Sequence, residues 1–106
     1  MNVIDNIKKC FFNNKVLYTK HALTEMEIEE FGQIFDYEIE ELFTNCEIIE
    51  SYENDKPYPS YLISGFSNNN RPLHIVVAYN LNDDIIIIIT AYQPDPKKWE
   101  NYKIRR

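Results

Sequence analysis

The sequence of 106 residues has few glycines, cysteines and histidines, and it lacks a long apolar run. With two glycines and five prolines there is little room for a linker or a disordered segment, so we expect one domain over residues 1–106. The longest apolar run, the isoleucines of 85–89, is far too short to cross a membrane. Two distant cysteines and two distant histidines have no metal-ligand spacing, and the sequence predicts no metal site and no cofactor.

The cysteines and the N-terminus favour a cytoplasmic protein. Cys10 and Cys46 stand alone rather than in a CxxC pair, and we interpret them as buried thiols in a reducing compartment, with a disulfide as the alternative. Residues 1–12 carry Asp5 and lack the continuous apolar core of a secretory signal.

Charge is distributed unevenly along the chain, with a net value of −6. Eleven of the seventeen acids lie in residues 25–53, which contain no lysine or arginine, whereas five bases and one acid lie in residues 97–106. The net charge argues against a nucleic-acid partner, but a dipolar molecule could still bind a phosphate at its basic end. The acidic stretch would then face away or attract a cationic partner, unless it is simply a solvated helix face.

Apolar spacing predicts helices in the first half of the chain and strands in the second. We expect a first helix over residues 2–12. A second helix should begin at about residue 22 with Thr24 or Thr19 as its N-cap, and a third should cover residues 37–45 with Asp36 as its N-cap. Turn-rich pieces separate four strand candidates, "CEIIESYEN", "SYLISGFS", "PLHIVVAYN" and "DIIIIITAY". The prediction is an α+β domain whose helices pack on an antiparallel sheet of four strands, with a fifth around 17–19 at one edge.

The isoleucine run predicts an interior strand covered on both faces, because it is apolar on both parities. If the loop before it has an odd number of residues, His74 lies opposite Thr90 or close to it, on the same face as Ile88 and Tyr92. Polar groups would then gather where the apolar floor ends, as in a cleft. The plainer alternative is that these are satisfied core or surface residues, and that Trp99 and Tyr102 are packing anchors.

Four pieces of the chain, in order, resemble a widespread bacterial domain family of unknown function that has been grouped with the RelE/barnase-like ribonucleases. The pieces are "TKHAL" (19–23), "EIIESYENDKPYPSYLISG" (47–65), "RPLHIVVAYN" (71–80) and "IITAYQPDPKKWENYKIRR" (88–106). The resemblance implies a curved antiparallel sheet and a toxin that is often encoded beside a zinc-ribbon antitoxin. It also implies polar site positions at His21, His74, Thr90 and Tyr92.

The sequence departs from the family pattern at one place. A basic residue usually follows the histidine-containing helix, but residues 25–37 contain none. This departure, with a sequence pI of about 4.8, favours an alternative function: a non-catalytic protein-binding module, either an inactive toxin relative or an acidic immunity-type protein.

If the protein is a metal-independent endoribonuclease, a base must take the 2′-OH proton and an acid must protonate the leaving oxygen. His21 and His74 are the candidates for both roles, and their order is open. Thr90 and Tyr92 would position the phosphate, and Arg71, Arg105 or Arg106 would neutralise it. The expected partners are RNA and a cognate antitoxin, with neither DNA nor a membrane.

Overall fold

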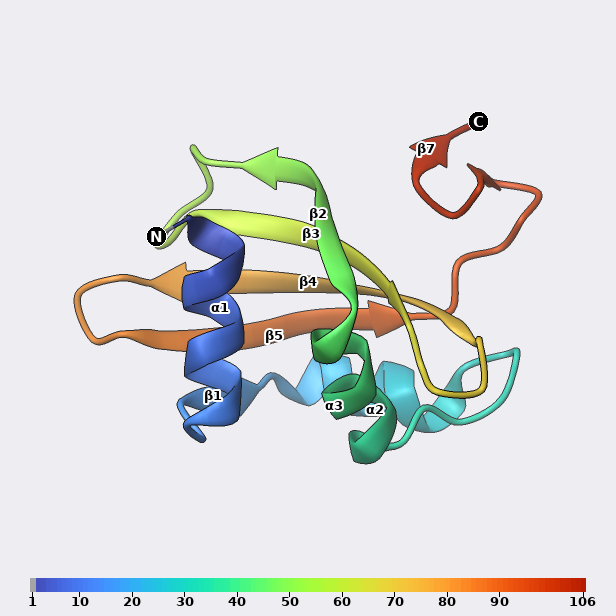
Figure 1. Ribbon diagram of the computed structural model, residues 1–106, viewed down its shortest axis with the longest axis horizontal. Coiled ribbons are helices and arrows are strands. Elements are labelled where there is room, and N and C mark those ends of the chain that lie inside the picture. Colours follow the sequence, from blue (N-terminus) through green and yellow to red (C-terminus); the bar gives the residue numbers. More distant parts are fainter. Residues whose placement is uncertain (1) are drawn as a thin grey trace.

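The computed structural model describes residues 2–106. Three helices, α1 (Val3–Phe12), α2 (Lys20–Ile28) and α3 (Asp36–Thr44), pack on a five-stranded sheet (Figure 1). The sheet strands are β1 (Val16–Tyr18), β2 (Cys46–Tyr52), β3 (Ser60–Phe66), β4 (Pro72–Asn80) and β5 (Ile85–Tyr92). The predicted α+β class is confirmed. Two short strands that the sequence did not predict, β6 (Trp99–Glu100) and β7 (Ile104–Arg105), form a separate hairpin near the C-terminus.

The sheet has the order β1-β5-β4-β3-β2 and is mixed rather than wholly antiparallel. The four predicted strands form the expected antiparallel meander. The short edge strand also exists, but β1 runs parallel to β5 because its connection to the meander passes through α2 and α3.

Local capping explains where α2 and α3 begin. The hydroxyl of Thr19 accepts the amide of Ala22 (3.0 Å) and donates to the carbonyl of Ile89 (3.1 Å), so one side chain both starts α2 and ties it to β5. The predicted N-cap of α3 was wrong by one residue: it is Phe35, not Asp36. The reason is that Glu38 stands three residues after Phe35 and accepts its amide (3.1 Å).

The main core lies between the sheet and α1 and α3, with α2 closing it beside β5 (Figure 1). Its side chains are aliphatic or aromatic and include the fully buried Ile7, Ile39, Phe43, Ile75, Val77, Ile86 and Ile88. The isoleucine strand is interior, as predicted, but it is not equally covered. Ile86 and Ile88 are buried against the helices, whereas Ile85, Ile87 and Ile89 on the other side are half-buried.

The β4–β5 hairpin has His74 and Tyr92 on one face, as predicted, but its loop length is not the one on which the prediction was based. Its loop has an even number of residues, since Asn80 pairs with Ile85, and an even loop alone would separate His74 from Tyr92. A bulge at Ile89 adds one residue and restores the shared face. As a result His74 lies opposite Tyr92, not opposite Thr90.

The bulge also changes two neighbouring pairs. Thr90 pairs with Val76, two residues along β4 from His74 and on the same face of the sheet. Ile88, which we predicted on that face, pairs with Val77 and points into the helix-covered core.

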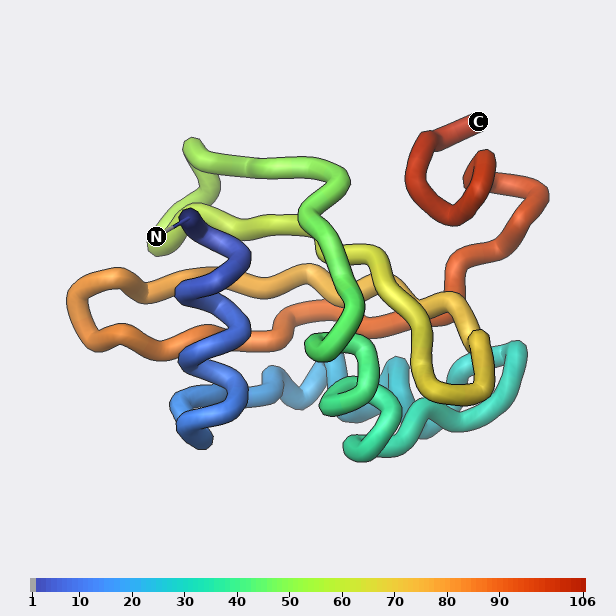
Figure 2. Tube along the Cα trace, viewed as in Figure 1, coloured from blue at the N-terminus to red at the C-terminus, as the bar shows by residue number. Residues whose placement is uncertain are grey.

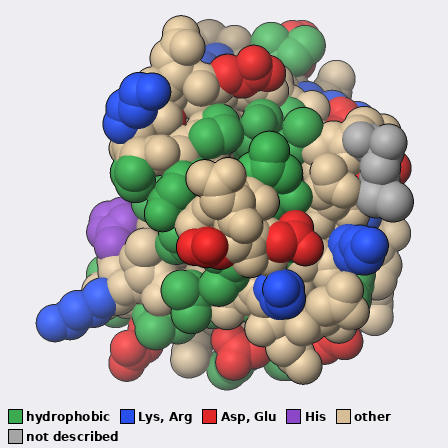
Figure 3. Space-filling model, turned by 90° about the vertical axis from the view of Figure 1, so that its left-hand side faces the viewer, with side chains coloured by type: hydrophobic (Ala, Val, Ile, Leu, Met, Phe, Trp, Pro, Cys, Tyr) green, Lys and Arg blue, Asp and Glu red, His purple; other side chains and the backbone are tan. Residues whose placement is uncertain are grey.

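The C-terminal segment leaves the end of β5 and returns beside β2 (Figure 2). The side of the molecule seen in Figure 3 presents hydrophobic side chains among acidic and basic ones. Cys10 is a buried free thiol and Cys46 a half-buried one, and burial is the main reason that the pKa of each rises to about 11. Among residues 2–106 there is no helix with the length and apolarity that a bilayer crossing requires.

Candidate functional site

His74 lies near the start of β4, opposite the last residue of β5, on the sheet face turned away from the helices, and it has no exposed surface. Its Nε2 is 2.6 Å from the carbonyl oxygen of Tyr102, and its Nδ1 is 3.0 Å from the hydroxyl of Tyr92. The ring of Trp99 stands edge-on to the imidazole, with centroids 4.5 Å apart. The predicted opening of His74 into a cleft is therefore wrong, because the C-terminal segment covers it.

These two contacts fix the tautomer of the imidazole. A carbonyl oxygen accepts only, so Nε2 carries the hydrogen and Nδ1 accepts the hydroxyl hydrogen of Tyr92. Desolvation by burial lowers the pKa of His74 below 6.5, and the hydrogen bond to Tyr102 opposes this only in part. The ring is neutral, and both of its nitrogens are occupied.

Tyr92 connects this sealed imidazole to the surface. Its ring is half-buried and lines a groove, while its hydroxyl hydrogen points to His74. Burial raises the pKa of Tyr92 to about 12, so the hydroxyl stays protonated at neutral pH. Because its hydrogen is donated to His74, this oxygen can only accept from any further partner.

The basic C-terminus binds back onto the acidic strand β2. The guanidinium of Arg105 donates to both carboxylate oxygens of Glu50, from Nε (2.9 Å) and from Nη2 (3.1 Å). Its Cζ lies 4.6 Å from the centroid of the Trp99 ring. Lys103 pairs with Glu47 at 3.3 Å. The expectation that the acidic stretch faces away from the basic end is wrong for these two glutamates.

Glu50 is the central anion of this contact. It accepts from Arg105 and also from the hydroxyl of Tyr52. The hydrogen bond from Arg105 is the largest of the effects that hold the pKa of Glu50 below 4.5. The pair is an ionised one at neutral pH.

His21 lies on α2, where 68% of its side chain is exposed. Its Nε2 is 3.4 Å from Oε1 of Glu25, and the same carboxylate oxygen accepts the backbone amide of Ala91 (3.2 Å). Glu25 therefore fixes His21 beside the end of β5. His21 does not share the sealed position of His74.

A second glutamate one turn later repeats this contact. Glu29 accepts the backbone amide of Gln93 (2.8 Å), two residues beyond Ala91. A helical spacing of four residues spans about 6 Å, and two strand residues span nearly the same length. Beyond the end of β1, the backbone amides at this edge of β5 are therefore bound by the carboxylates of Glu25, on α2, and Glu29, the residue after it. This role was not predicted, although the spacing of four residues between Glu25 and Glu29 is visible in the sequence.

A groove of about 500 Å³ separates α2 from the C-terminal segment. One wall comes from α2 and the turn after it, and the other from the residues that follow β5. Its charged and polar lining consists of Glu25, Glu29, Glu30, Tyr92, Gln93, Asp95, Lys98 and Arg105. Lys98 is exposed, and two cations and the side chain of Tyr92 line this space together with four acids.

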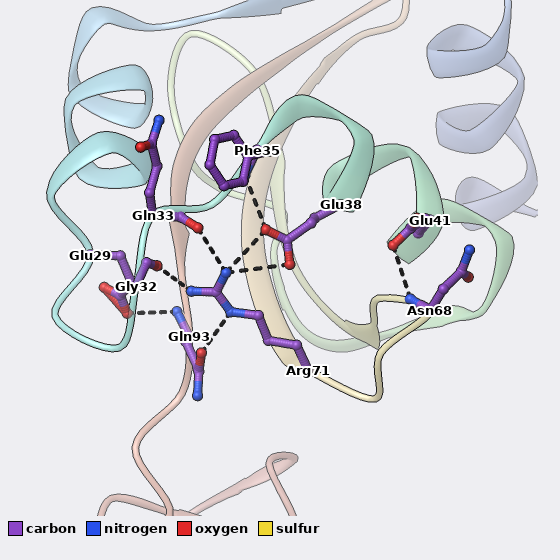
Figure 4. A network of polar contacts seen from close by, with 9 residues as sticks. All are labelled: Glu29, Gly32, Gln33, Phe35, Glu38, Glu41, Asn68, Arg71 and Gln93. Carbon is purple, nitrogen blue, oxygen red and sulfur yellow. Dashed lines mark hydrogen bonds and ion pairs between the residues drawn. The ribbon is translucent and has the colours of Figure 1, made fainter.

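Arg71 is fully engaged in holding the turn between α2 and α3 (Figure 4). Its Nη1 contacts both carboxylate oxygens of Glu38 (3.0 and 3.3 Å) and the carbonyl of Gln33 (2.9 Å). Its Nε donates to Gln93 (2.7 Å), and its Nη2 donates to the carbonyl of Gly32, whose φ of 113° needs a glycine. With these acceptors around it and 17% of its side chain exposed, Arg71 is not placed to hold a phosphate.

The predicted site residues therefore fall into separate places. His74, Thr90 and Tyr92 share one face of the sheet, and Arg105 joins Tyr92 at the groove. Arg106 donates to the carbonyl of Pro96 (2.8 Å) within the C-terminal segment. Over residues 2–106 there is no cluster of three or more histidine, cysteine or acidic side chains arranged to hold a metal ion.

Comparisons with known proteins leave the chain with a family but no named relative. No curated protein and no solved structure matches it. A family model described as "Domain of unknown function (DUF4258)" matches residues 18–93, which run from the end of β1 to just past β5 and hold His21, His74, Thr90 and Tyr92. On this match, which spans most of the chain, the protein belongs to the DUF4258 family.

Proposed function

We propose that the protein is a metal-independent endoribonuclease of a bacterial toxin–antitoxin system, and that RNA binds in the groove between α2 and the C-terminal segment. The observation that carries the proposal is the convergence of Tyr92, Lys98 and Arg105 on this groove, with the Glu25–His21 pair at its rim. The free thiols Cys10 and Cys46 support a reducing cytoplasm as its location.

The tautomer of His74 assigns a different role to each histidine. His74 holds the hydroxyl hydrogen of Tyr92, so the tyrosine oxygen is left as an acceptor for the 2′-hydroxyl of a nucleotide next to the one that is cleaved. DNA lacks that hydroxyl, which would make Tyr92 a determinant of RNA over DNA. His74 is then a positioning residue rather than the acid or the base.

His21 is the proton-transfer group in this scheme. Glu25 holds its Nε2 and leaves Nδ1 to take the 2′-hydroxyl proton. The 2′ oxygen attacks phosphorus, the bond from phosphorus to the 5′ oxygen breaks, and the ammonium of Lys98 protonates the leaving oxygen. Arg105 stabilises the charge that develops on the phosphate.

The test is cleavage of a single-stranded RNA oligomer by the purified protein in the presence of a metal chelator. We expect products with 2′,3′-cyclic phosphate ends, a loss of about a hundredfold or more in rate for His21→Ala, and a smaller loss for Tyr92→Phe. Glu25→Gln should also lower the rate, because it weakens the contact that holds His21. Glu27→Gln is its matched control, because Glu27 is exposed on the same helix outside this groove. Undiminished cleavage by His21→Ala would overturn the assignment.

A second candidate is the non-catalytic protein-binding module. It is favoured by the groove itself, in which Glu25, Glu29, Glu30 and Asp95 outnumber the two cations and oppose a polyanion. If the folded protein cleaves no RNA and arrests no growth while binding a cognate antitoxin or another protein tightly, this candidate replaces the first.

A further inference from the structure

Exposed apolar side chains gather where the end of α1, strand β1 and the start of α3 meet. Phe12 and Tyr37 are 50% and 54% exposed, and Phe35 is 44% exposed. The rings of Phe35 and Tyr37 stack with centroids 5.7 Å apart. Stacking holds two large rings in place at the surface, where each leaves apolar area in water.

These side chains border two adjoining hollows. The larger, about 500 Å³, lies between α1, β1 and α3, and its lining includes Phe12, Tyr18 and Tyr37. The smaller, about 290 Å³, lies between α2 and the start of α3, and its lining includes Phe35. Both are lined by Asp36, so they form one continuous surface, which we call the aromatic groove.

The charged side chains in the aromatic groove are all acidic. They are Glu27, Asp36 and Glu40, and each is exposed. Asp36 also contributes, after burial, to raising the pKa of Tyr18 to about 12, which is the effect expected of a local negative field. Apolar hollows with an acidic border match a ligand that is apolar along one face and cationic beside it.

We propose that the aromatic groove binds a basic amphipathic helix of a partner protein. Apolar side chains spaced at i, i+3 or i+4 and i+7 would fill the two hollows, and lysines or arginines beside them would meet the three acids. RNA is disfavoured by the same acids. A symmetric dimer through this groove is also disfavoured, because it would bring each acid against acids of a second copy. The proposal does not depend on RNA cleavage in the groove that Tyr92 lines.

The test uses a synthetic amphipathic helix of leucine and lysine, fluorescently labelled, and fluorescence anisotropy with the full chain. Two control peptides are the same sequence with glutamate for lysine and a scrambled order of the leucine–lysine peptide. We expect binding of the leucine–lysine helix alone, weakening as salt is raised. Tyr37→Ala and Phe12→Ala should each reduce affinity about tenfold, as aromatic anchors do.

Matched variants separate the groove from general effects of charge and exposure. Leu81→Ala removes a side chain that is 69% exposed on the β4–β5 loop and should leave affinity unchanged. Glu40→Lys should weaken binding several-fold, whereas Glu53→Lys makes the same change of net charge outside the groove and should have a much smaller effect. Thermal unfolding of each variant verifies that it is folded.

Three results would overturn the proposal. The acidic or scrambled peptide could bind as tightly as the leucine–lysine helix. The Tyr37→Ala and Leu81→Ala variants could lose affinity equally. The free protein could also be a dimer by light scattering that Tyr37→Ala dissociates, which would assign the groove to a second copy of the chain.

Discussion

Arg71 and Arg105 each bind a glutamate through more than one hydrogen bond, but they do so in opposite surroundings. The side chains of Arg71 and Glu38 are 17% and 8% exposed, and two backbone carbonyls and Gln93 complete the arginine's contacts. The side chains of Arg105 and Glu50 are 62% and 26% exposed, and the guanidinium also lies over Trp99.

The difference shows that burial, more than the identity of the residue, decides what an arginine can do here. A largely buried guanidinium, all three of whose nitrogens donate within the protein, fixes the turn after α2 and has little to offer a ligand. A solvated guanidinium beside a groove can exchange a carboxylate for a phosphate at small cost. Substitutions of these two arginines and of the two histidines test this contrast.

Arg71→Ala should lower the free energy of unfolding by about 3–5 kcal/mol, because it leaves the buried Glu38 carboxylate without a counter-ion. Urea unfolding followed by the fluorescence of Trp99, the single tryptophan, measures it. The double variant Arg71→Met with Glu38→Leu should recover part of the loss, because it removes the unpaired charge but still leaves the turn carbonyls and the Phe35 amide without their partners. A loss below about 1 kcal/mol for Arg71→Ala would show that the pair behaves as an exposed one.

His74→Ala should cost about 3 kcal/mol in the same experiment. The change opens a cavity under Trp99 and leaves the Tyr92 hydroxyl and the Tyr102 carbonyl without their partner. His21→Ala, on the exposed face of α2, should change stability by less than about 0.5 kcal/mol. Equal effects of the two substitutions would contradict the buried placement of His74.

The pH dependence of stability should also report the burial of His74. The folded-state pKa of His74 lies below its unfolded value of 6.5, so the unfolded chain takes up a proton first as the pH falls. The contribution of His74 is therefore fully present above pH 6.5 and is lost as the pH falls towards the folded-state pKa. His74→Gln should flatten the curve of melting temperature in this range.

The same measurement has a separate acid limb. The pKa of Glu50 is depressed by Arg105, so the stability it contributes is present above pH 4.5 and is lost below that value as the carboxylate is protonated. A curve for His74→Gln that still falls between pH 6.5 and 5 would assign the transition to another group.

Arg105→Ala should lower the free energy of unfolding by at most about 1 kcal/mol, because exposed pairs gain little in water. If RNA binds in the groove, the same variant should bind a single-stranded oligomer several-fold more weakly, and the slope of affinity against salt should become shallower. Lys56→Ala, on the exposed loop between β2 and β3, is the control. Unchanged RNA affinity would remove Arg105 from the proposed site.

Much of the fold could be predicted because it follows from local patterns. Period-two runs located the four meander strands, and apolar spacing located α1. Thr19 is one of the two N-caps considered for α2. The sequence could not show that β1 is parallel, since a strand of three residues carries no signal of direction.

The site could be predicted less well, because it depends on contacts between distant residues. The shared face of His74, Thr90 and Tyr92 was predicted, but it depends on a bulge at Ile89 that a row of isoleucines gives no means of locating. The cover over His74 comes from residues about 28 positions later, where the proline-rich stretch suggested only the end of a strand.

The α+β class and the helix-then-sheet order follow from local patterns in the sequence, since periodicity and turn residues act over a few neighbours. The residues that carry polar chemistry could be located in the same way. Which of them reach solvent depends on the packed chain: Arg71 and His74 are enclosed, whereas His21 and Arg105 are not. Exposure is a property of the packed chain, because it depends on segments that meet only when the whole sheet and its C-terminal cover have assembled.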